Sequence, residues 1–299
     1  MPPLSDTATP RFCAICGETA RPAEVDRIRS NVRRFRERRF EIWRCPACQS
    51  LHCEPVADLA AYYQGYPIRA QRLDYFSRAW YAVVLRRLVQ AGFTRQHRLL
   101  DHGCNQGLFL AYLKEQGYTQ CTGYDPFVER FHDAAVLQQR YDVVVSLDVI
   151  EHDTDPADHL GRMVALLQPA GLLCIETPNA SGIDLRQPET YLHALHLPYH
   201  QHILSWQGLQ QLAQGNGLQQ VRAWDRWYMD AWQPATSRRL IEGLLLHGDN
   251  DIDAGYEPPR LGLFLRHPSL LFHLLFGYFV PGRKNDHMMM MFRPVQDHG

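Results

Sequence analysis

Two spacings of apolar residues divide most of the chain into expected helices and strands. Apolar positions recur every three or four residues in four stretches that end at Gly, Asn-Gly or Pro, which predicts helices over 74–91, 108–116, 155–168 and 205–216. Short runs of apolar and β-branched residues predict strands over 99–101, 121–125, 141–147, 171–177, 220–227 and 288–292.

Strands that alternate with helices predict an α/β fold of the Rossmann-like type, a mostly parallel sheet with helices on both faces. Residues 233–282 interrupt the alternation with apolar helical pieces, so a helical insertion is expected there. No internal repeat is found along the sequence.

Composition and charge exclude some classes of protein. The 299 residues are 45% hydrophobic, which is enough for a large core, and a net charge of −1 disfavours a uniformly basic nucleic-acid-binding protein. The first residues lack the features of a secretion signal, so a cytoplasmic location is expected. The apolar run 270–280 is about half of a membrane span, which predicts a buried helix or a patch that meets a lipid-like substrate.

Four of the eight cysteines form two matched pairs, Cys13 with Cys16 and Cys45 with Cys48. Two residues between thiolates allow one tight turn to offer two sulfurs, and two such turns complete a tetrahedral zinc site. A redox pair or free thiols are the alternatives. With zinc, the expected organisation is a zinc ribbon over 1–57, a linker over 58–73 and the main domain over 74–299.

The segment between the two cysteine pairs is rich in arginine, with Arg27, Arg29, Arg33, Arg34, Arg36, Arg38 and Arg39. Alternating apolar residues favour a ribbon strand with one solvated, charged face. A contact with nucleic acid or phosphate is the alternative.

The loop after the first predicted strand of the main domain contains Asp101, Gly103 and Gly107, in the pattern Asp-x-Gly-x-x-x-Gly. It lacks the third glycine of a dinucleotide fingerprint. The loop instead resembles motif I of the class I S-adenosylmethionine-dependent methyltransferases. Similar runs follow in the right order at 123–126, 141–152, 167–171 and 176–179, and the resemblance covers about 74–230 and 286–294.

This resemblance implies a binding site for S-adenosylmethionine, in which a carboxylate at Asp125 accepts hydrogen bonds from both ribose hydroxyls. The implied donor-site residues are Asp101, Gly103, Cys104, Asn105, Gln106, Gly107, Asp125, Pro126, Leu147 and Asp148. Only about 15 residues separate Asp125 from Tyr141, so the third strand of the family is expected to be short or absent, and no adenine contact is assigned. A ribbon ahead of such a domain, linked by a Tyr-rich segment, is similar to a bacterial subgroup.

Two candidates stand on the acceptor side. Asp148, Glu151 and His152 resemble the acidic-x-x-Glu-His run with which ubiquinone-biosynthesis O-methyltransferases hold a divalent cation such as Mg²⁺ or Mn²⁺, although Asp replaces Glu at the first position. The alternative is that Glu151 and His152 only form hydrogen bonds with the loop backbone.

The second candidate is the run Tyr199-His200-Gln201-His202, which resembles the Tyr-x-Glu-His of deoxysugar C-methyltransferases. Gln201 replaces their Glu, so the base is expected to be His202 or His200, and Tyr199 and His152 are further catalytic candidates. A histidine that only anchors the loop is the alternative. His193 and His196 are expected at the surface.

The sequence therefore predicts methyl transfer to oxygen or carbon of a small molecule, such as a sugar, a phenol or a lipid-linked precursor. An RNA-directed methyltransferase, or a nucleic-acid-binding zinc protein that uses Arg27 to Arg39, is one alternative. A non-catalytic S-adenosylmethionine-binding protein is the other.

Overall fold

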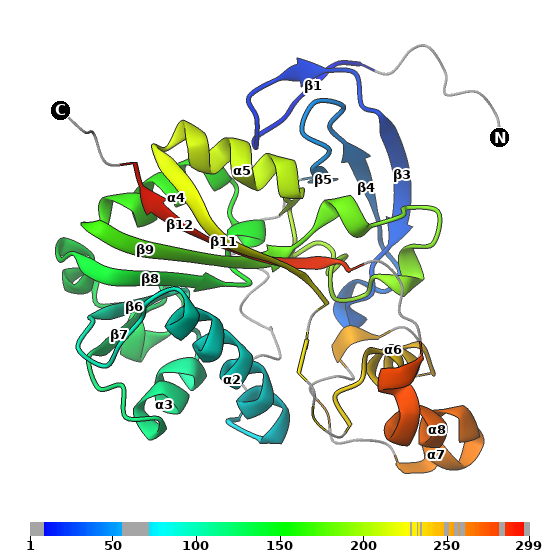
Figure 1. Ribbon diagram of the computed structural model, residues 1–299. Coiled ribbons are helices and arrows are strands. Elements are labelled where there is room, and N and C mark those ends of the chain that lie inside the picture. Colours follow the sequence, from blue (N-terminus) through cyan, green and yellow to red (C-terminus); the bar gives the residue numbers. More distant parts are fainter. Residues whose placement is uncertain are drawn as a thin grey trace.

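The computed structural model describes residues 9–55, 72–227, 229–231, 233, 235–247, 251–253, 257, 261–280 and 285–295. A central sheet covered by helices occupies one part of the molecule, and a small ribbon sheet lies beside one end of it (Figure 1). The linker expected over 58–73 lies almost entirely outside the described residues.

The central sheet has six strands among the described residues: β6 (Leu99–His102), β7 (Cys121–Tyr124), β8 (Tyr141–Leu147), β9 (Leu167–Pro178), β11 (Leu218–Arg226) and β12 (His287–Pro294). Their order is β11-β12-β9-β8-β6-β7. Strands β6 to β9 are parallel, and β12 is antiparallel to both of its neighbours. The predicted, mostly parallel sheet is confirmed.

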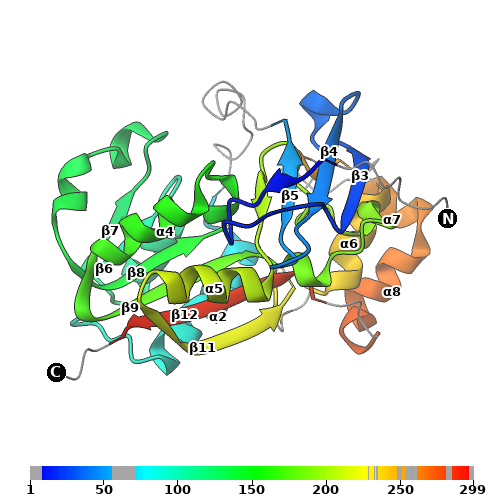
Figure 2. The ribbon, with the colours of Figure 1, turned by 90° about the horizontal axis from the view of Figure 1, so that it is seen from above.

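Helices cover both faces of this sheet, α2 (Tyr75–Gln90) and α3 (Leu108–Glu115) on one and α4 (Pro156–Ala165) and α5 (Trp206–Gly215) on the other (Figures 1 and 2). Successive side chains of a strand point to opposite faces. In β12, Met288 and Met290 therefore pack with α4 and α5, whereas Met289 and Met291 pack with α2 and α3. Helices cover both faces of β8, β9 and β12, which explains why these central strands are rich in buried apolar residues.

The third strand of the expected pattern is absent from the described part of the chain. The sheet ends at β7, and two short 3-10 helices, Glu129–Phe131 and Ala134–Gln138, connect β7 to β8. The short spacing between Asp125 and Tyr141 thus has the predicted consequence.

The ribbon contains a small hairpin, β1 (Arg11–Phe12) and β2 (Thr19–Ala20), and an antiparallel sheet of β3 (Glu24–Arg29), β4 (Arg39–Arg44) and β5 (Leu51–Glu54), with a 3-10 turn at Arg33–Phe35. The edge strand next to β5 is β10 (His202–Ile203), which comes from the main domain. Buried ribbon residues share their hydrophobic clusters with residues of the main domain. The ribbon is therefore packed as part of one body.

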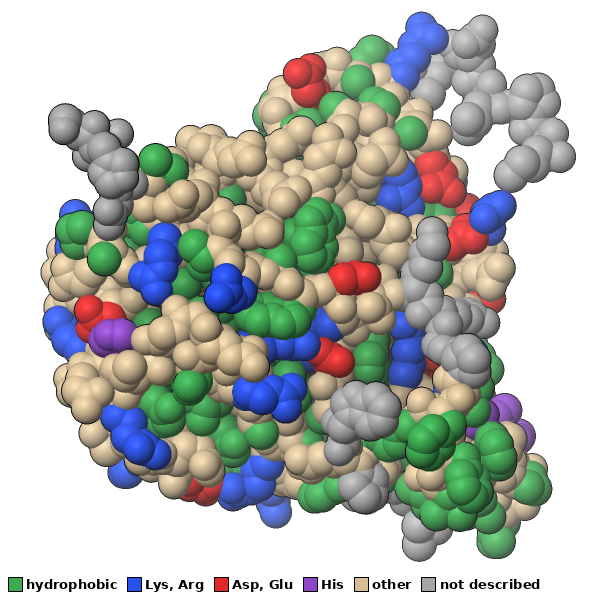
Figure 3. Space-filling view, in the orientation of Figure 1, with side chains coloured by type: hydrophobic (Ala, Val, Ile, Leu, Met, Phe, Trp, Pro, Cys, Tyr) green, Lys and Arg blue, Asp and Glu red, His purple; other side chains and the backbone are tan. Residues whose placement is uncertain are grey.

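The insertion expected over 233–282 contains α6 (Arg238–His247), α7 (Leu261–Arg266), α8 (Pro268–Phe276) and a 3-10 turn at Gly277–Phe279. Large apolar side chains gather on its outer surface, at Leu265, Leu271, Phe272, Leu275, Phe276 and Phe279. Figure 3 shows this apolar surface over α7 and α8. Within the described residues, the helices are too short or too polar to span a bilayer.

Candidate functional site

The glycine loop joins the end of β6 to α3 and is fastened to the end of β7. The backbone N–H groups of Gly103 and Cys104 donate to the carbonyl of Tyr124, at 2.8 and 3.1 Å. The N–H of Asn105 donates to Asp125 Oδ2 at 2.9 Å. The structure thus brings together the predicted loop and the predicted ribose acceptor at the carboxyl edge of the sheet, where open α/β sheets bind ligands.

Two glycines of this loop have no room for a side chain. Gly103 has φ +84°, and a Cβ there would lie 2.5 Å from Val149 Cγ2. Gly107 has φ +66°, and its Cβ would lie 2.5 Å from Phe131 Cζ. The loop backbone can approach its neighbours this closely only because both positions are glycine.

Two buried carboxylates flank the loop. Asp125 accepts hydrogen bonds from Asn105 and Phe127, but no hydrogen bond reaches the Asp101 carboxylate from the described residues. Burial, together with the nearby Asp125, raises the pKa of Asp101 to about 7. A positively charged ligand would lower this pKa and supply the missing partner. The pair therefore favours a cationic ligand that also carries hydroxyl groups.

The other predicted donor-site residues lie around the same edge. Cys104 is buried, Asn105, Gln106, Leu147 and Asp148 are half-buried, and Pro126 is exposed beyond β7. Burial raises the pKa of the Cys104 thiol, so this side chain is uncharged at neutral pH. Asp148 has φ +53°, and its N–H donates to the carbonyl of Glu176 on the neighbouring strand.

On the acceptor side, Glu151 and His152 lie in a 3-10 turn, Ile150–His152, that follows β8. The Glu151 side chain is fully buried; its Oε2 accepts from Thr177 Oγ1 at 2.9 Å, and its Oε1 has no hydrogen-bond partner among the described residues. Burial raises the pKa of Glu151 to about 8.

His200 faces this carboxyl group, with its Nε2 3.8 Å from Glu151 Oε1. The other ring nitrogen, Nδ1, lies 2.8 Å from the carbonyl of Ala194, which can only accept, so Nδ1 carries the proton. Burial lowers the pKa of His200 well below its usual range. His200 is therefore a neutral imidazole whose Nε2 lone pair points towards Glu151.

His152 has a similar arrangement. Its Nδ1 lies 3.0 Å from the carbonyl of Tyr199, and its ring packs edge-on against that of His200. One ligating atom each from Glu151, His152 and His200 lie within 4.8 Å of one another. Asp148, the third residue of the predicted metal site, is not part of this group, and its role stays a prediction.

The side chains of Tyr199 and His202 face the ribbon. The Tyr199 ring is buried next to Phe35. His202 Nδ1 lies 2.9 Å from Nδ1 of His52, and its Nε2 lies 3.3 Å from the carbonyl of Thr154. Both nitrogens of His202 are therefore engaged by protein groups.

The expected surface position of His196 is wrong, because this side chain is only 3% exposed. Its ring packs against Tyr199 and His200. His193 is half-buried, and burial lowers its pKa to about 4. The spacing of the histidines carried no information on burial, because this segment forms neither a long helix nor a strand.

Sequence reasoning missed a buried charge network between the acceptor side and α2. Glu176 on β9 and Arg226 at the end of β11 form an ion pair in which both side chains are fully buried. Arg226 also lies 3.7 Å from Asp230, which pairs with Arg87 of α2. The sequence feature that could have indicated this network is the glutamate inside the apolar run of β9, because a buried charge needs a partner in the fold.

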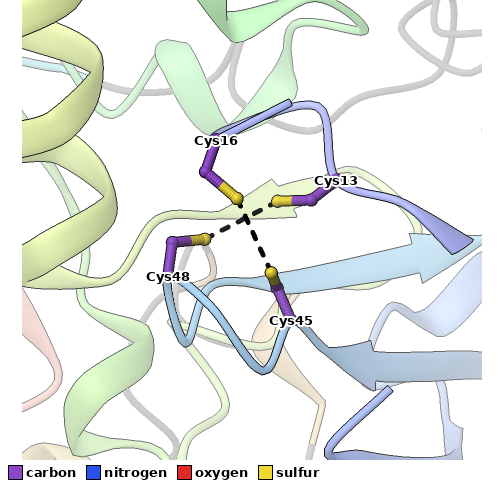
Figure 4. Close-up of side chains that lie close together, drawn as sticks. All are labelled: Cys13, Cys16, Cys45 and Cys48. Atoms are coloured by element: carbon purple, nitrogen blue, oxygen red, sulfur yellow. Dashed lines mark hydrogen bonds between the residues drawn. The ribbon is translucent and has the colours of Figure 1, made fainter. Parts of the chain in front are cut away.

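The four paired cysteines converge at the tip of the ribbon (Figure 4). Cys13 Sγ lies 3.6 Å from Cys48 Sγ, and Cys16 Sγ lies 3.7 Å from Cys45 Sγ. Four sulfurs bonded to one tetrahedral zinc at about 2.3 Å lie about 3.8 Å apart. The four thiols therefore fit a zinc ion without rearrangement.

The fold and the glycine loop define a class I methyltransferase of the S-adenosylmethionine-dependent type. A family described as "Methyltransferase domain" matches residues 72–223, just over half of the chain. The chain belongs to this family.

Curated relatives are similar over a shorter stretch. The ubiquinone biosynthesis O-methyltransferase of Bradyrhizobium sp. (strain ORS 278) is 30% identical over 102 residues, which is 27% of this chain and 40% of the relative. That of Cereibacter sphaeroides (strain ATCC 17025 / ATH 2.4.3) is 30% identical over 119 residues, 33% of this chain and 45% of the relative. The matches thus span less than half of these relatives.

Among solved structures, coclaurine N-methyltransferase bound to N-methylheliamine and SAH is similar to this chain with a TM-score of 0.50. The alignment covers 81% of this chain and 83% of that chain, at 16% sequence identity. This similarity concerns the fold alone.

Proposed function

We propose that this protein transfers the methyl group of S-adenosylmethionine to an oxygen or carbon atom of a small molecule. The observation that carries the proposal is the pair of buried carboxylates beside the glycine loop, Asp101 without a hydrogen-bond partner among the described residues and Asp125 at the end of β7. Membership of the methyltransferase family supports the same donor.

S-adenosylmethionine supplies a methyl group on a positively charged sulfur, together with an ammonium group and a ribose. Asp125 keeps one further lone pair on each oxygen, which suits it to accept from the ribose hydroxyls. Asp101 suits a cationic group, because its own pKa is raised by burial and the ligand's charge would stabilise its ionised form. Gly103 and Gly107 let the loop backbone pass close to the ligand.

We assign the proton-accepting role to His200 rather than to His202. The Nε2 lone pair of His200 faces the acceptor side, and its Nδ1–H is fixed by Ala194. As the acceptor oxygen gains the methyl group, its proton would pass to His200 Nε2, which lies 3.8 Å from Glu151 Oε1. His152 and Tyr199 position the His200 segment through their hydrogen bond.

A divalent cation held by Glu151, His152 and His200 is the second candidate for this site. The grouping of their ligating atoms within 4.8 Å favours it. Two imidazoles and one carboxylate suit Mn²⁺ or Zn²⁺ better than Mg²⁺, which prefers oxygen ligands. In this variant of the proposal the cation, rather than His200, would stabilise the acceptor oxyanion.

The zinc ribbon over 1–57 is proposed to hold one structural zinc ion on Cys13, Cys16, Cys45 and Cys48. Four thiolates leave no open coordination position for catalysis. The zinc ion would order the ribbon against α5. At the start of this helix, Ser205 accepts from the Gly208 N–H and donates to the Cys48 carbonyl. The exposed apolar surface of α7 and α8 supports contact with a lipid-like acceptor.

Calorimetry with S-adenosylhomocysteine tests the donor site. The wild-type chain should bind it, and Asp125→Ala should weaken binding by roughly 10- to 100-fold, because ribose hydroxyls lose a charged acceptor. Asp133→Asn, an exposed aspartate in the next loop, is the matched control and should bind as the wild type does. No binding by the wild type would sink the proposal, as would unchanged binding by Asp125→Ala.

An acceptor screen with labelled methyl donor separates the enzyme from a non-catalytic binding protein. Label transferred to any small molecule, and lost in His200→Ala, is the expected result. Label transferred only to RNA would support the RNA-directed alternative instead.

A further inference from the structure

A cavity of about 880 Å³ lies between the ribbon and the main domain. Its walls include four arginines of the ribbon, Arg27, Arg29, Arg36 and Arg39, and two carboxylates, Asp26 and Glu189. Leu246 of α6 closes another side, and Figures 1 and 2 place β3 and α6 on the same side of the molecule. We call this cavity the arginine groove. The arginine side chains of β3 are exposed, as expected of a solvated strand face, and they also line this groove.

The arginines of the groove differ in how far carboxylates neutralise them. Arg29 and Arg39 lie directly opposite each other on β3 and β4, and like charges in that position repel. Arg29 donates to Glu37 at 2.9 Å. Arg39, by contrast, donates only to the Arg27 carbonyl, at 3.1 Å, and has no carboxylate partner in the described part of the chain.

The carboxylates next to the other two arginines are shared. Glu41 accepts from Arg27 at 3.2 Å and also from Arg11. Asp251 lies 3.4 Å from Arg36 and 2.6 Å from Arg33. Each of these carboxylates is shared by two guanidinium groups, but Arg11 also pairs with Glu54, and Arg33 with Glu257. Arg39 is therefore the arginine of the groove whose charge is left without a carboxylate partner among the described residues.

Asn31, which lines the groove, has a buried hydrogen-bond acceptor. Asn31 is only 9% exposed, and its Nδ2 donates to the Leu192 carbonyl at 2.5 Å. Its Oδ1 is buried and has no hydrogen-bond partner among the described residues. An unpaired buried acceptor costs free energy.

The arginine groove adjoins a second cavity, of about 230 Å³, that leads towards the central sheet. Glu189, Leu192 and Leu246 line both cavities. The second cavity extends to Asp286, which contacts His287 at the start of β12. This strand start lies beside the end of β9, the edge of the sheet at which the acceptor side was described.

We propose that the arginine groove binds the phosphate or diphosphate group of the methyl acceptor, so that the acceptor is a phosphorylated small molecule. This inference rests on the proposed methyl transfer and adds the substrate class. Arginine binds phosphate through paired, charge-assisted hydrogen bonds. The volume is that of a small-molecule site, and Leu192 and Leu246 of α6 line it beside the arginines.

Calorimetry with inorganic pyrophosphate as the probe tests the groove. The wild type should bind pyrophosphate, and Arg39→Ala and Arg29→Ala should each weaken binding about tenfold or more, since each removes charge-assisted hydrogen bonds. Arg39→Lys keeps the charge but loses the paired geometry, and should fall between wild type and Arg39→Ala. Arg222→Ala removes an exposed arginine that does not line the groove, and should bind as the wild type does.

Equal losses in Arg39→Ala and Arg222→Ala would overturn the inference, because they would indicate general charge attraction. Tighter binding of a short single-stranded RNA than of pyrophosphate, weakened by the same variants, would also overturn it. S-adenosylhomocysteine is titrated in parallel with each variant. If the wild type binds S-adenosylhomocysteine but not pyrophosphate, the groove proposal alone is wrong. If the wild type does not bind S-adenosylhomocysteine, the proposed function is wrong.

Discussion

His52 of the ribbon and His202 of the main domain lie opposite each other across the β5–β10 pairing, with their Nδ1 atoms 2.9 Å apart. Only one proton can lie between the two nitrogens, so one ring donates and the other accepts. His52 Nε2 in turn lies 3.2 Å from Cys13 Sγ. A continuous line of side chains therefore joins the cysteine cluster to the segment that carries His200.

This line of contacts separates the roles of the two neighbouring histidines. His200→Ala should lower turnover by about 10² to 10⁴ and leave S-adenosylhomocysteine binding unchanged, because it removes a proton acceptor. His202→Ala should instead lower the melting temperature, because it leaves His52 and the Thr154 carbonyl without partners. Kinetics and thermal unfolding of both variants check this. The reverse pattern would return the catalytic role to His202.

The cysteine cluster should bind one zinc per chain. Cys45→Ser should lose most of the metal and destabilise the ribbon, because three thiolates and one hydroxyl hold zinc less well. Elemental analysis and thermal unfolding are the measurements. Cys121→Ser, a half-buried cysteine on β7 outside the cluster, should keep the wild-type zinc content. Full zinc in Cys45→Ser would contradict the four-cysteine site.

Gly103→Ala should reduce both stability and donor binding. The new Cβ would meet Val149 at 2.5 Å, and the backbone would keep a φ of +84°, which together cost about 1 to 3 kcal/mol of unfolding free energy. Gly215→Ala at the end of α5 meets no atom within 4 Å and should be neutral or slightly stabilising. Adding Val149→Ala to Gly103→Ala should recover only that part of the lost unfolding free energy which comes from the contact between the new Cβ and Val149. Denaturant unfolding measures all four proteins.

Stability should fall as the pH drops below about 6.5, partly because of His102. Burial, with a contribution from His159 and Arg162, lowers the pKa of His102 to about 4. His102 therefore binds a proton near pH 6.5 in the unfolded chain but only near pH 4 in the folded chain. The free energy of unfolding falls by on the order of 2 kcal/mol by pH 5.

Urea unfolding at pH 7 and pH 5 measures this effect. His102→Asn should lose less stability between the two pH values than the wild type does, because the substituted side chain does not titrate. His132→Asn, at an exposed histidine, should lose as much as the wild type. An identical pH dependence in the wild type and His102→Asn would contradict the assignment.

The sequence by itself determined the parts of this protein that depend on neighbouring residues. The period of apolar positions specified the strands and helices of the central fold, and the short spacing after Asp125 predicted that the third strand is short or absent. The glycine loop could also be predicted from the sequence. Gly103 and Gly107 have a positive φ and closely packed neighbours, and glycine is the residue that fits both conditions. The two cysteine turns were equally local, since each contains its own pair of thiols.

The tertiary structure alone decided which distant side chains meet and how far each is removed from water. Glu176 and Arg226 pair 50 residues apart, and Glu151 meets His200 from another loop. His202 became part of the ribbon through the β10 pairing, and the arginines became the wall of a cavity only when α6 packed beside them. Burial sets the pKa of such groups, and burial is a property of the whole packed chain, which no local spacing encodes.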